Sequence, residues 1–294
     1  MNPFQQYGVT QGERLLRKLG HQGKFIFRME DAHALTRELG IKNLRVLLSQ
    51  LVRGGWLQHL SRGLYAFGAV TPASPQIPSF AIATARVKPS AISHWSALHF
   101  HGFTEQIPRT VTAFTPRRVI TPSMRRTTDH GTDNPHYWEI AGVCYEYIFV
   151  TRAAFFGIEE IWMSEFFKVP ITDPERTLLE GFISPRYFGG LGEILSILES
   201  HLGTVNVDKL INYALHYQKA AVIKRLGWAL ESAGVSENKL VPLLKFPLTG
   251  YRILDPVRPL SGRHNKRWMI DENLSPGVLI EALTNTNSRG GKAE

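Results

Sequence analysis

The clearest hydrophobic pattern in the chain lies between residues 42 and 53. Leucines at 44, 47, 48 and 51 follow the spacing i, i+3, i+4, i+7, which places them on one face of an α-helix. At about 100° per residue, the opposite face is basic and polar. It carries Lys42, Arg45, Ser49 and Arg53, with Asn43 and Gln50 on the flank. The pattern predicts an amphipathic helix that ends at the glycine pair 54–55.

Shorter patterns surround this helix. Apolar periodicity predicts helices over residues 11–19 and 31–39, and alternation predicts strands over 24–28, 56–60 and 64–67. Residues 61–63 form the turn between the last two strands, since Gly63 tolerates a positive φ. Two helices joined by a tight turn and followed by a hairpin are typical of a winged helix-turn-helix. We therefore predict such a domain over residues 1–72.

In a winged helix-turn-helix, the second helix enters the major groove of DNA and the hairpin reaches a phosphate or the minor groove. Arg, Lys, Asn and Gln suit that position because their side chains reach base edges and phosphates. The candidate DNA-binding residues are Lys42, Asn43, Arg45, Ser49, Gln50, Arg53 and Arg62. The alternative is a helical subdomain whose charges only interact with solvent.

The rest of the chain predicts a larger mixed α+β domain over residues 79–275, after a proline-rich linker and before a flexible tail at 276–294. We expect small antiparallel strands, followed by helices. The predicted strands are 91–93, 110–115, 137–140 and 143–150, and the predicted helices are 79–87, 95–101, 173–183, 193–201, 207–217 and 219–233. Asp173 is the expected N-cap of its helix, with Pro174 at the first helical position.

Charge narrows the choice of partners. The chain has 294 residues and a net charge of +9, and counting by segment gives +6 for residues 1–75, +6 for 76–128, −8 for 129–205 and +5 for 206–294. The first excess falls on the predicted winged helix, which favours DNA as the anionic partner. The second excess of positive charge, in residues 76–128, includes a loop that either extends the DNA contact or is simply solvated. The basic residues of this loop are Arg117, Arg118, Arg125 and Arg126. The acidic segment suits a basic protein partner.

Other features exclude several classes of protein. A single cysteine, Cys144, excludes an internal disulfide and a cysteine-rich metal site. The uncharged stretch 63–85 contains three prolines, so it cannot form one membrane-spanning helix, and residues 1–7 do not resemble a signal peptide. We expect a cytoplasmic protein without membrane contact.

The search for enzyme chemistry gives only weak candidates. The glycine-rich segment 187–192 lacks a lysine and fixed glycine spacing, so a tight turn is favoured over a phosphate site. His94, His99 and His101 are expected at scattered surface or half-buried positions. Glu237 and Lys239 have nuclease-like spacing, but we place them in a polar turn without an acidic partner strand. We expect no catalytic site, metal or cofactor; a nucleic-acid-processing enzyme such as a nuclease is the alternative.

Several short segments follow one another over residues 10–275. They are Arg62-Gly63-Leu64-Tyr65, Ile92 to Leu98 with His101-Gly102, Thr110 to Thr115, Asp173 to Glu180, Tyr187 to Gly190, Lys224 to Gly227, and Leu254-Asp255-Pro256 with Gly262, Arg267-Trp268 and Asn273. In this order they resemble the AbiEi family of antitoxins from abortive-infection toxin–antitoxin systems of type IV. The match departs from the family at two positions, since Glu180 stands where the family usually has Asp, and Lys224 where it usually has Arg.

The resemblance implies a two-domain antitoxin. Its winged helix would bind inverted repeats in its own promoter and repress the operon, and its C-terminal domain would counteract a cognate nucleotidyltransferase toxin encoded beside it. Some family members act as plain transcriptional regulators without a toxin, and this alternative stays open. We therefore expect a sequence-specific repressor and antitoxin, not an enzyme, with double-stranded DNA and the toxin as partners. A pure protein-interaction module is a further alternative.

Overall fold

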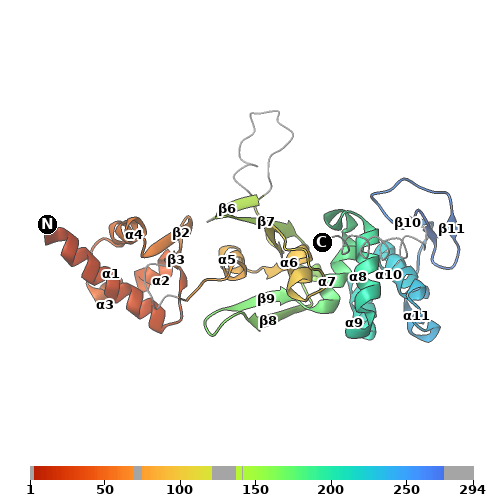
Figure 1. The fold of residues 1–294 in the computed structure, drawn as a ribbon, viewed down its shortest axis with the longest axis horizontal. Helices are drawn as coiled ribbons and strands as arrows, with labels where there is room; N and C mark the ends of the chain where they lie inside the picture. The colour runs from red at the N-terminus through yellow and green to blue at the C-terminus, as the bar shows by residue number, and fades with distance from the viewer. Residues whose placement is uncertain (1–2, 69–74, 121–136, 141, 275–294) are drawn as a thin grey trace, which may run out of the picture.

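The computed structural model describes residues 3–68, 75–120, 137–140 and 142–274. The predicted tail at 276–294, the expected boundary at residue 72, and Arg125 and Arg126 lie outside the described residues. Figure 1 shows the N-terminal helices, the central sheet and the C-terminal helices following one another along the long axis. The mixed α+β fold class predicted from the sequence is confirmed.

Residues 3–67 form four helices and a three-stranded antiparallel sheet of order β1-β3-β2. The leucine stripe predicted for residues 44–51 is buried as expected, against Leu15, Leu19 and Phe27. Burial of each such side chain contributes about 1.5–3 kcal/mol. The elements are α1 (Pro3–His21), β1 (Ile26–Arg28), α2 (Met29–Ala34), α3 (Thr36–Leu39), α4 (Leu44–Arg53), β2 (Leu57–Ser61) and β3 (Leu64–Phe67).

The second region is built on a six-stranded sheet of order β6-β7-β5-β4-β9-β8. The expectation of antiparallel strands is confirmed for β6–β7, β4–β5 and β8–β9. It was wrong for the other two pairs, because β5 pairs with β7, and β4 with β9, in parallel. Local patterning does not encode parallel pairing, which joins segments distant in the chain. The strands are β4 (Ala91–Ile92), β5 (Thr110–Thr115), β6 (Tyr137–Ile140), β7 (Val143–Phe149), β8 (Ile158–Trp162) and β9 (Lys168–Thr172).

The helices α5 (Ser79–Arg86) and α6 (His94–Phe100) accompany this sheet, and the short 3-10 turn η2 (Arg152–Ala154) follows β7. The N-terminal unit, residues 11–68, packs directly on this region. Phe25 meets Phe166 edge to face at 4.8 Å between ring centroids. The Arg28 guanidinium donates to the carbonyl oxygens of Ala85 and Arg86 at 3.0 and 3.2 Å. An apolar cluster and two bonds to backbone carbonyls at the end of α5 therefore join the unit to the second region.

The third region is helical and ends in a small sheet of order β10-β12-β11. Trp268 is fully buried there, against Gly227 of α10: a Cβ on Gly227 would lie 2.0 Å from Trp268 Cζ3. The elements are α7 (Pro174–Ile183), η3 (Pro185–Phe188), α8 (Leu191–His201), η4 (Leu202–Thr204), α9 (Val207–Tyr217), α10 (Ala220–Ser232), α11 (Glu237–Leu244), β10 (Arg252–Ile253), β11 (His264–Asn265) and β12 (Ile270–Asp271).

Two sequence predictions for this region have clear outcomes. Asp173 caps α7 as expected, since its Oδ1 accepts from the Arg176 backbone N–H at 2.8 Å. Glu237 and Lys239 do not lie in a polar turn; they begin helix α11, which follows Ser236. In the part of the chain that is described, no helix is both long and apolar enough to cross a bilayer.

Candidate functional site

The outer face of α4 is exposed along its whole length, opposite the buried leucine stripe. Arg45, Ser49, Gln50 and Arg53 all lie on this face. Among the described residues, Arg45 has no hydrogen-bond or ion-pair partner, and Arg53 reaches only Ser49 Oγ, at 3.5 Å. These side chains are therefore available to an external partner.

Helix α4 begins two residues later than predicted, at Leu44. The reason is Asn43, whose Oδ1 accepts a hydrogen bond from the Val46 backbone N–H at 3.2 Å. An N-cap of this kind contributes about 0.5–2 kcal/mol to stability. Asn43 thus has a structural role at the helix start, and Lys42 stands in the preceding turn, exposed.

One exposed side chain on this face escaped the sequence reasoning. Val46 is apolar and yet 48% exposed, and its neighbours on the outer face are polar or basic. It lies one turn from Lys42 and one turn from Gln50, so it belongs to the outer face. The sequence indicates this position, because Val46 is an apolar residue that lies outside the leucine stripe. Apolar side chains on a recognition helix contact the methyl group of thymine.

The turn between β2 and β3 presents Arg62 to solvent. Gly63 follows it with a φ of +72°, as the turn requires. The Met29 backbone N–H donates to the Gly63 carbonyl oxygen at 2.8 Å, which fixes the turn to the start of α2. Arg62 itself has no polar partner within the described ranges.

The second predicted basic patch is only partly described. Arg117 and Arg118 are exposed just after β5. The Arg117 Nη1 donates to the Lys88 carbonyl oxygen at 2.9 Å, and the Arg118 guanidinium lies 5.8 Å from the ring centroid of Phe149. Arg125 and Arg126 lie outside the described residues.

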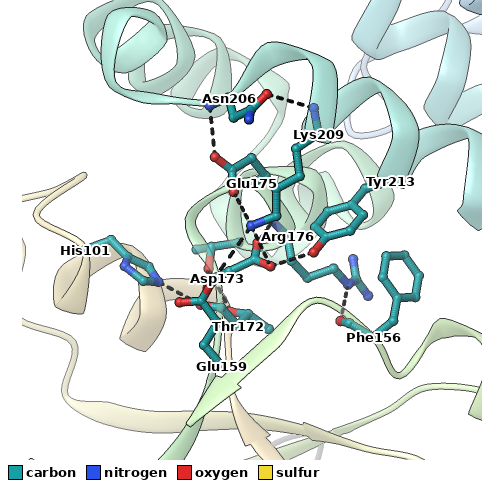
Figure 2. Close-up of polar contacts among 11 residues, drawn as sticks. His101, Phe156, Glu159, Thr172, Asp173, Glu175, Arg176, Asn206, Lys209 and Tyr213 are labelled. Carbon is teal, nitrogen blue, oxygen red and sulfur yellow. Dashed lines mark hydrogen bonds and ion pairs between the residues drawn. The ribbon is translucent and has the colours of Figure 1, made fainter. Parts of the chain in front are cut away.

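The helical half holds a different kind of charged cluster, centred on Lys209 (Figure 2). Lys209 Nζ lies 2.9 Å from Glu175 Oε2 and 3.2 Å from Asp173 Oδ2. Burial alone would lower the pKa of Lys209, but the bonds and charges of these two carboxylates raise it above its usual value. Tyr213 donates its hydroxyl to Asp173 Oδ2 at 2.7 Å, and burial together with this bond raises the pKa of Tyr213 to about 12. The cluster ties α9 to the start of α7.

A second charged group lies beneath it. Arg176 is completely buried, with its Nη2 2.7 Å from Glu180 Oε1, and it donates to the carbonyl oxygens of Ala154 and Phe156. Glu180 Oε2 lies 3.7 Å from His94 Nε2. The expectation that His94 is a surface or half-buried histidine was wrong: it is 1% exposed and stacks on Phe188. Burial lowers the pKa of His94.

Ser93, His94 and Glu180 stand in the order of a hydrolase triad, with Ser93 Oγ 2.9 Å from His94 Nδ1. Ser93 and His94 are neighbours in the chain, and both are buried, Ser93 completely. A nucleophile must reach a substrate, and a fully buried hydroxyl does not. We interpret this group as part of the core.

The remaining enzyme candidates are occupied by contacts within the chain. Glu237 Oε1 accepts from Arg267 Nη2 at 2.8 Å, and Lys239 Nζ donates to Asp208 Oδ2 at 2.8 Å. Glu237 and Lys239 therefore bond to different partners and do not face a shared substrate site. The segment 187–192 is a tight turn as predicted, with positive φ at both of its first two glycines. After it, Asp255 Oδ2 accepts from the Leu191 backbone N–H at 3.2 Å, where a phosphate would otherwise bind. No three metal-ligating side chains converge within the described part of the chain.

Comparison with solved structures shows a similarity of fold. No family model matches the sequence, and no curated protein matches it. Among solved structures, the fold is similar to the crystal structure of RV2827C protein from Mycobacterium tuberculosis, with a TM-score of 0.62 and 16% sequence identity. The similarity covers 94% of this chain and 95% of the other. At this identity it shows the fold alone: the two chains share one architecture over nearly their whole lengths.

Proposed function

We propose that this protein is a sequence-specific DNA-binding repressor whose N-terminal unit is a winged helix-turn-helix. The observation that carries the proposal is the outer face of α4, on which exposed cations that pair with no acid among the described residues lie opposite a buried leucine stripe. Helices α3 and α4 are joined by a tight turn at Gly40, whose φ is +65°, and the β2–β3 hairpin follows α4. This element order supports α4 as the recognition helix.

The proposed contacts follow from the side-chain chemistry. Arg45 and Arg53 suit bidentate bonds to guanine or salt links to phosphates. Ser49 and Gln50 suit hydrogen bonds to base edges, and Val46 suits the methyl group of thymine. Arg62, at the tip of the hairpin, suits a phosphate or the minor groove. Lys42, in the turn before α4, suits a phosphate at the rim of the major groove.

The antitoxin role is a second part of the proposal and rests on the resemblance to the AbiEi family. By that resemblance, the protein represses its own operon in the cytoplasm, and residues 79–275 counteract a nucleotidyltransferase toxin. The protein acts by binding and has no enzymatic step of its own. Expression of a neighbouring nucleotidyltransferase gene, with and without this chain, tests the role: growth arrest that this chain relieves is expected, and arrest that it leaves unchanged contradicts it.

The DNA-binding proposal is tested by gel shift of the full chain on the duplex upstream of its gene. The variant pair Lys42→Ala and Arg53→Ala removes two exposed cations from the face. If each contacts a phosphate, the slope of log K against log salt falls by about 0.9 per lost contact. Unchanged affinity of this variant at low and moderate salt contradicts the site assignment, and absence of wild-type binding contradicts the function.

A matched control is available in the helical half. Lys245 and Arg263 are also exposed, and the pair Lys245→Ala and Arg263→Ala removes the same net charge. The control variant is expected to bind the duplex like the wild type. If both variants bind the duplex equally more weakly than the wild type, the affinity depends on total charge and not on the outer face of α4.

A further inference from the structure

Basic residues from three separate segments meet at one end of the central sheet. Strands β5 and β7 run parallel, so their carboxyl ends lie at the same end of the sheet. Arg117 follows β5 by two residues, and Arg152 follows β7 by three. Strand β4 runs antiparallel to β5, so Lys88, which precedes β4, also lies there. The topology brings together cations that are far apart in the sequence.

These cations line a shallow hollow of about 480 Å³. Its walls are Lys88, Pro89, Pro116, Arg117, Arg152 and Phe155. None of the described lining residues is acidic, so in this part of the wall no carboxylate offsets the repulsion among three positive charges. An anion bound in the hollow would offset it.

The position of one cation is fixed by bonds within the chain. Thr115 Oγ1 accepts from the Arg117 backbone N–H at 3.2 Å and itself donates to the Pro89 carbonyl oxygen at 2.6 Å. The Arg117 side chain donates to the Lys88 carbonyl oxygen at 2.9 Å. Within the described residues, no acid forms an ion pair with Lys88, Arg117 or Arg152. The site is thus partly ordered in advance, and its charge is available to a ligand.

The hollow adjoins the N-terminal unit. A second hollow of about 750 Å³ shares Lys88, Pro89 and Phe155 with the first and is also lined by Gly23 and Ile26. Near this junction, burial raises the pKa of Asp31, but its bonds to Lys24 and Arg28 and the charge of Lys88 lower it overall. The charge of Lys88 therefore acts on a carboxylate of the N-terminal unit, which carries α4.

We propose that Lys88, Arg117 and Arg152 bind the phosphodiester backbone of DNA that flanks the segment read by α4. This inference rests on the proposed function, because α4 would bring the duplex to the protein. Duplex DNA carries phosphates at regular intervals on both strands, so a duplex that extends past the recognition site presents further anions. The sheet end would add affinity and fix orientation without adding sequence specificity.

The experiment compares two duplexes, a minimal one that only covers the recognition site and one extended on both sides. The full chain carries Lys88→Ala and Arg152→Ala; Arg117 is left in place because it bonds to the backbone. On the extended duplex, the slope of log K against log salt is expected to fall by about 1.8 for two lost contacts, and on the minimal duplex it is expected to stay unchanged. The control variant carries Lys245→Ala and Arg263→Ala, and its slope is expected to equal that of the wild type on both duplexes.

The outcomes separate this inference from the function on which it rests. Wild-type slopes for the variant on the extended duplex, together with binding that still depends on Lys42 and Arg53, overturn the inference and leave the repressor proposal standing. An equal loss on both duplexes overturns the assignment to flanking DNA. Competition by inorganic phosphate at millimolar concentration, without any effect of duplex length, would assign the hollow to a free phosphate and likewise overturn it. Absence of wild-type binding to either duplex overturns both proposals.

Discussion

The basic residues of α4 and three basic residues of the helical half have the same chemistry and opposite environments. Arg45 and Arg53 stand in solvent, whereas Arg176, Lys224 and Arg225 are buried at 0%, 2% and 7% exposure. Each buried cation bonds to acids or backbone carbonyls inside the chain, whereas among the described residues Arg45 has no polar partner and Arg53 reaches only Ser49 Oγ. Net charge therefore does not identify a binding surface; burial and pairing separate the cations that hold the fold from those that can take a ligand.

The buried cations mostly satisfy backbone carbonyls. Lys224 Nζ donates to the carbonyl oxygens of Leu243 and Leu244 at the end of α11, at 2.9 and 2.8 Å. Arg225 donates twice to the Ile253 carbonyl oxygen, at 3.1 Å each. The last carbonyls of a helix lack intrahelical partners, so a cation there supplies the missing bonds. Burial lowers the pKa of both side chains.

The largest expected effect on stability is at Arg176. The change Arg176→Met leaves the buried Glu180 carboxylate without its cation, and breaking a buried pair in this way costs about 3–5 kcal/mol. Urea denaturation measures the loss. The double change Arg176→Met with Glu180→Leu is expected to recover part of it, because no uncompensated charge remains. A loss below about 1 kcal/mol in the single variant would contradict the structural role.

A smaller loss is expected where α10 meets Trp268. The Cβ of Gly227→Ala would lie 2.0 Å from Trp268 Cζ3, so the ring or the helix must shift, at a cost of about 1–3 kcal/mol. Gly203 is the matched control, because a Cβ there meets nothing within 4 Å. Thermal unfolding of the two alanine variants checks the difference. Equal midpoints would show that the contact is not tight.

His94 gives a stability effect that depends on pH. Burial lowers its pKa from 6.5, so the folded state favours the neutral ring; the charge of Glu180 acts against this, and that of Arg176 acts with it. The unfolded state binds the proton more readily, so the contribution is present above about pH 6.5 and is lost as the pH falls below it. His94→Asn, a residue that tolerates the positive φ at this position, is expected to lessen that loss. Identical dependence on pH in both proteins contradicts this.

The smallest expected effect on stability is on the exposed face. The pair Arg45→Ala and Arg53→Ala should change the free energy of unfolding by no more than about 0.5 kcal/mol, because neither side chain is packed or paired with an acid. Urea denaturation checks this. A loss of more than about 2 kcal/mol in the free energy of unfolding would show that these arginines stabilise the fold as the buried cations do, and would contradict the distinction between the two groups.

The local elements were largely predictable from the sequence, because they depend on short-range periodicity. The leucine stripe, strand β5 and the Asp173 cap of α7 were all predicted correctly. Strands β8 and β9 were missed: β8 is an edge strand with two exposed acids, and Pro170 within β9 argues against a strand. Their place in the sheet depends on pairing with β4, far away in the sequence.

The candidate site divides in the same way. The outer face of α4 follows from helical geometry alone, so its polar and basic residues were found, although the exposed Val46 and the cap role of Asn43 were not. The burial of His94 depends on Phe188 and Glu180, more than 80 residues away, and no local pattern indicates it. The cation hollow at the end of the sheet requires the parallel pairing of β5 and β7, which the sequence analysis did not predict.

The most direct test of the central claim is amide hydrogen exchange of the full chain with and without its upstream duplex. The claim is that DNA binds the exposed cations of α4 and the hairpin, and that the buried cations serve the fold. Exchange is expected to slow in peptides covering residues 42–53 and 57–67 and to stay unchanged in residues 191–244. Slowing confined to residues 191–244, or no change anywhere on a bound duplex, would contradict the claim.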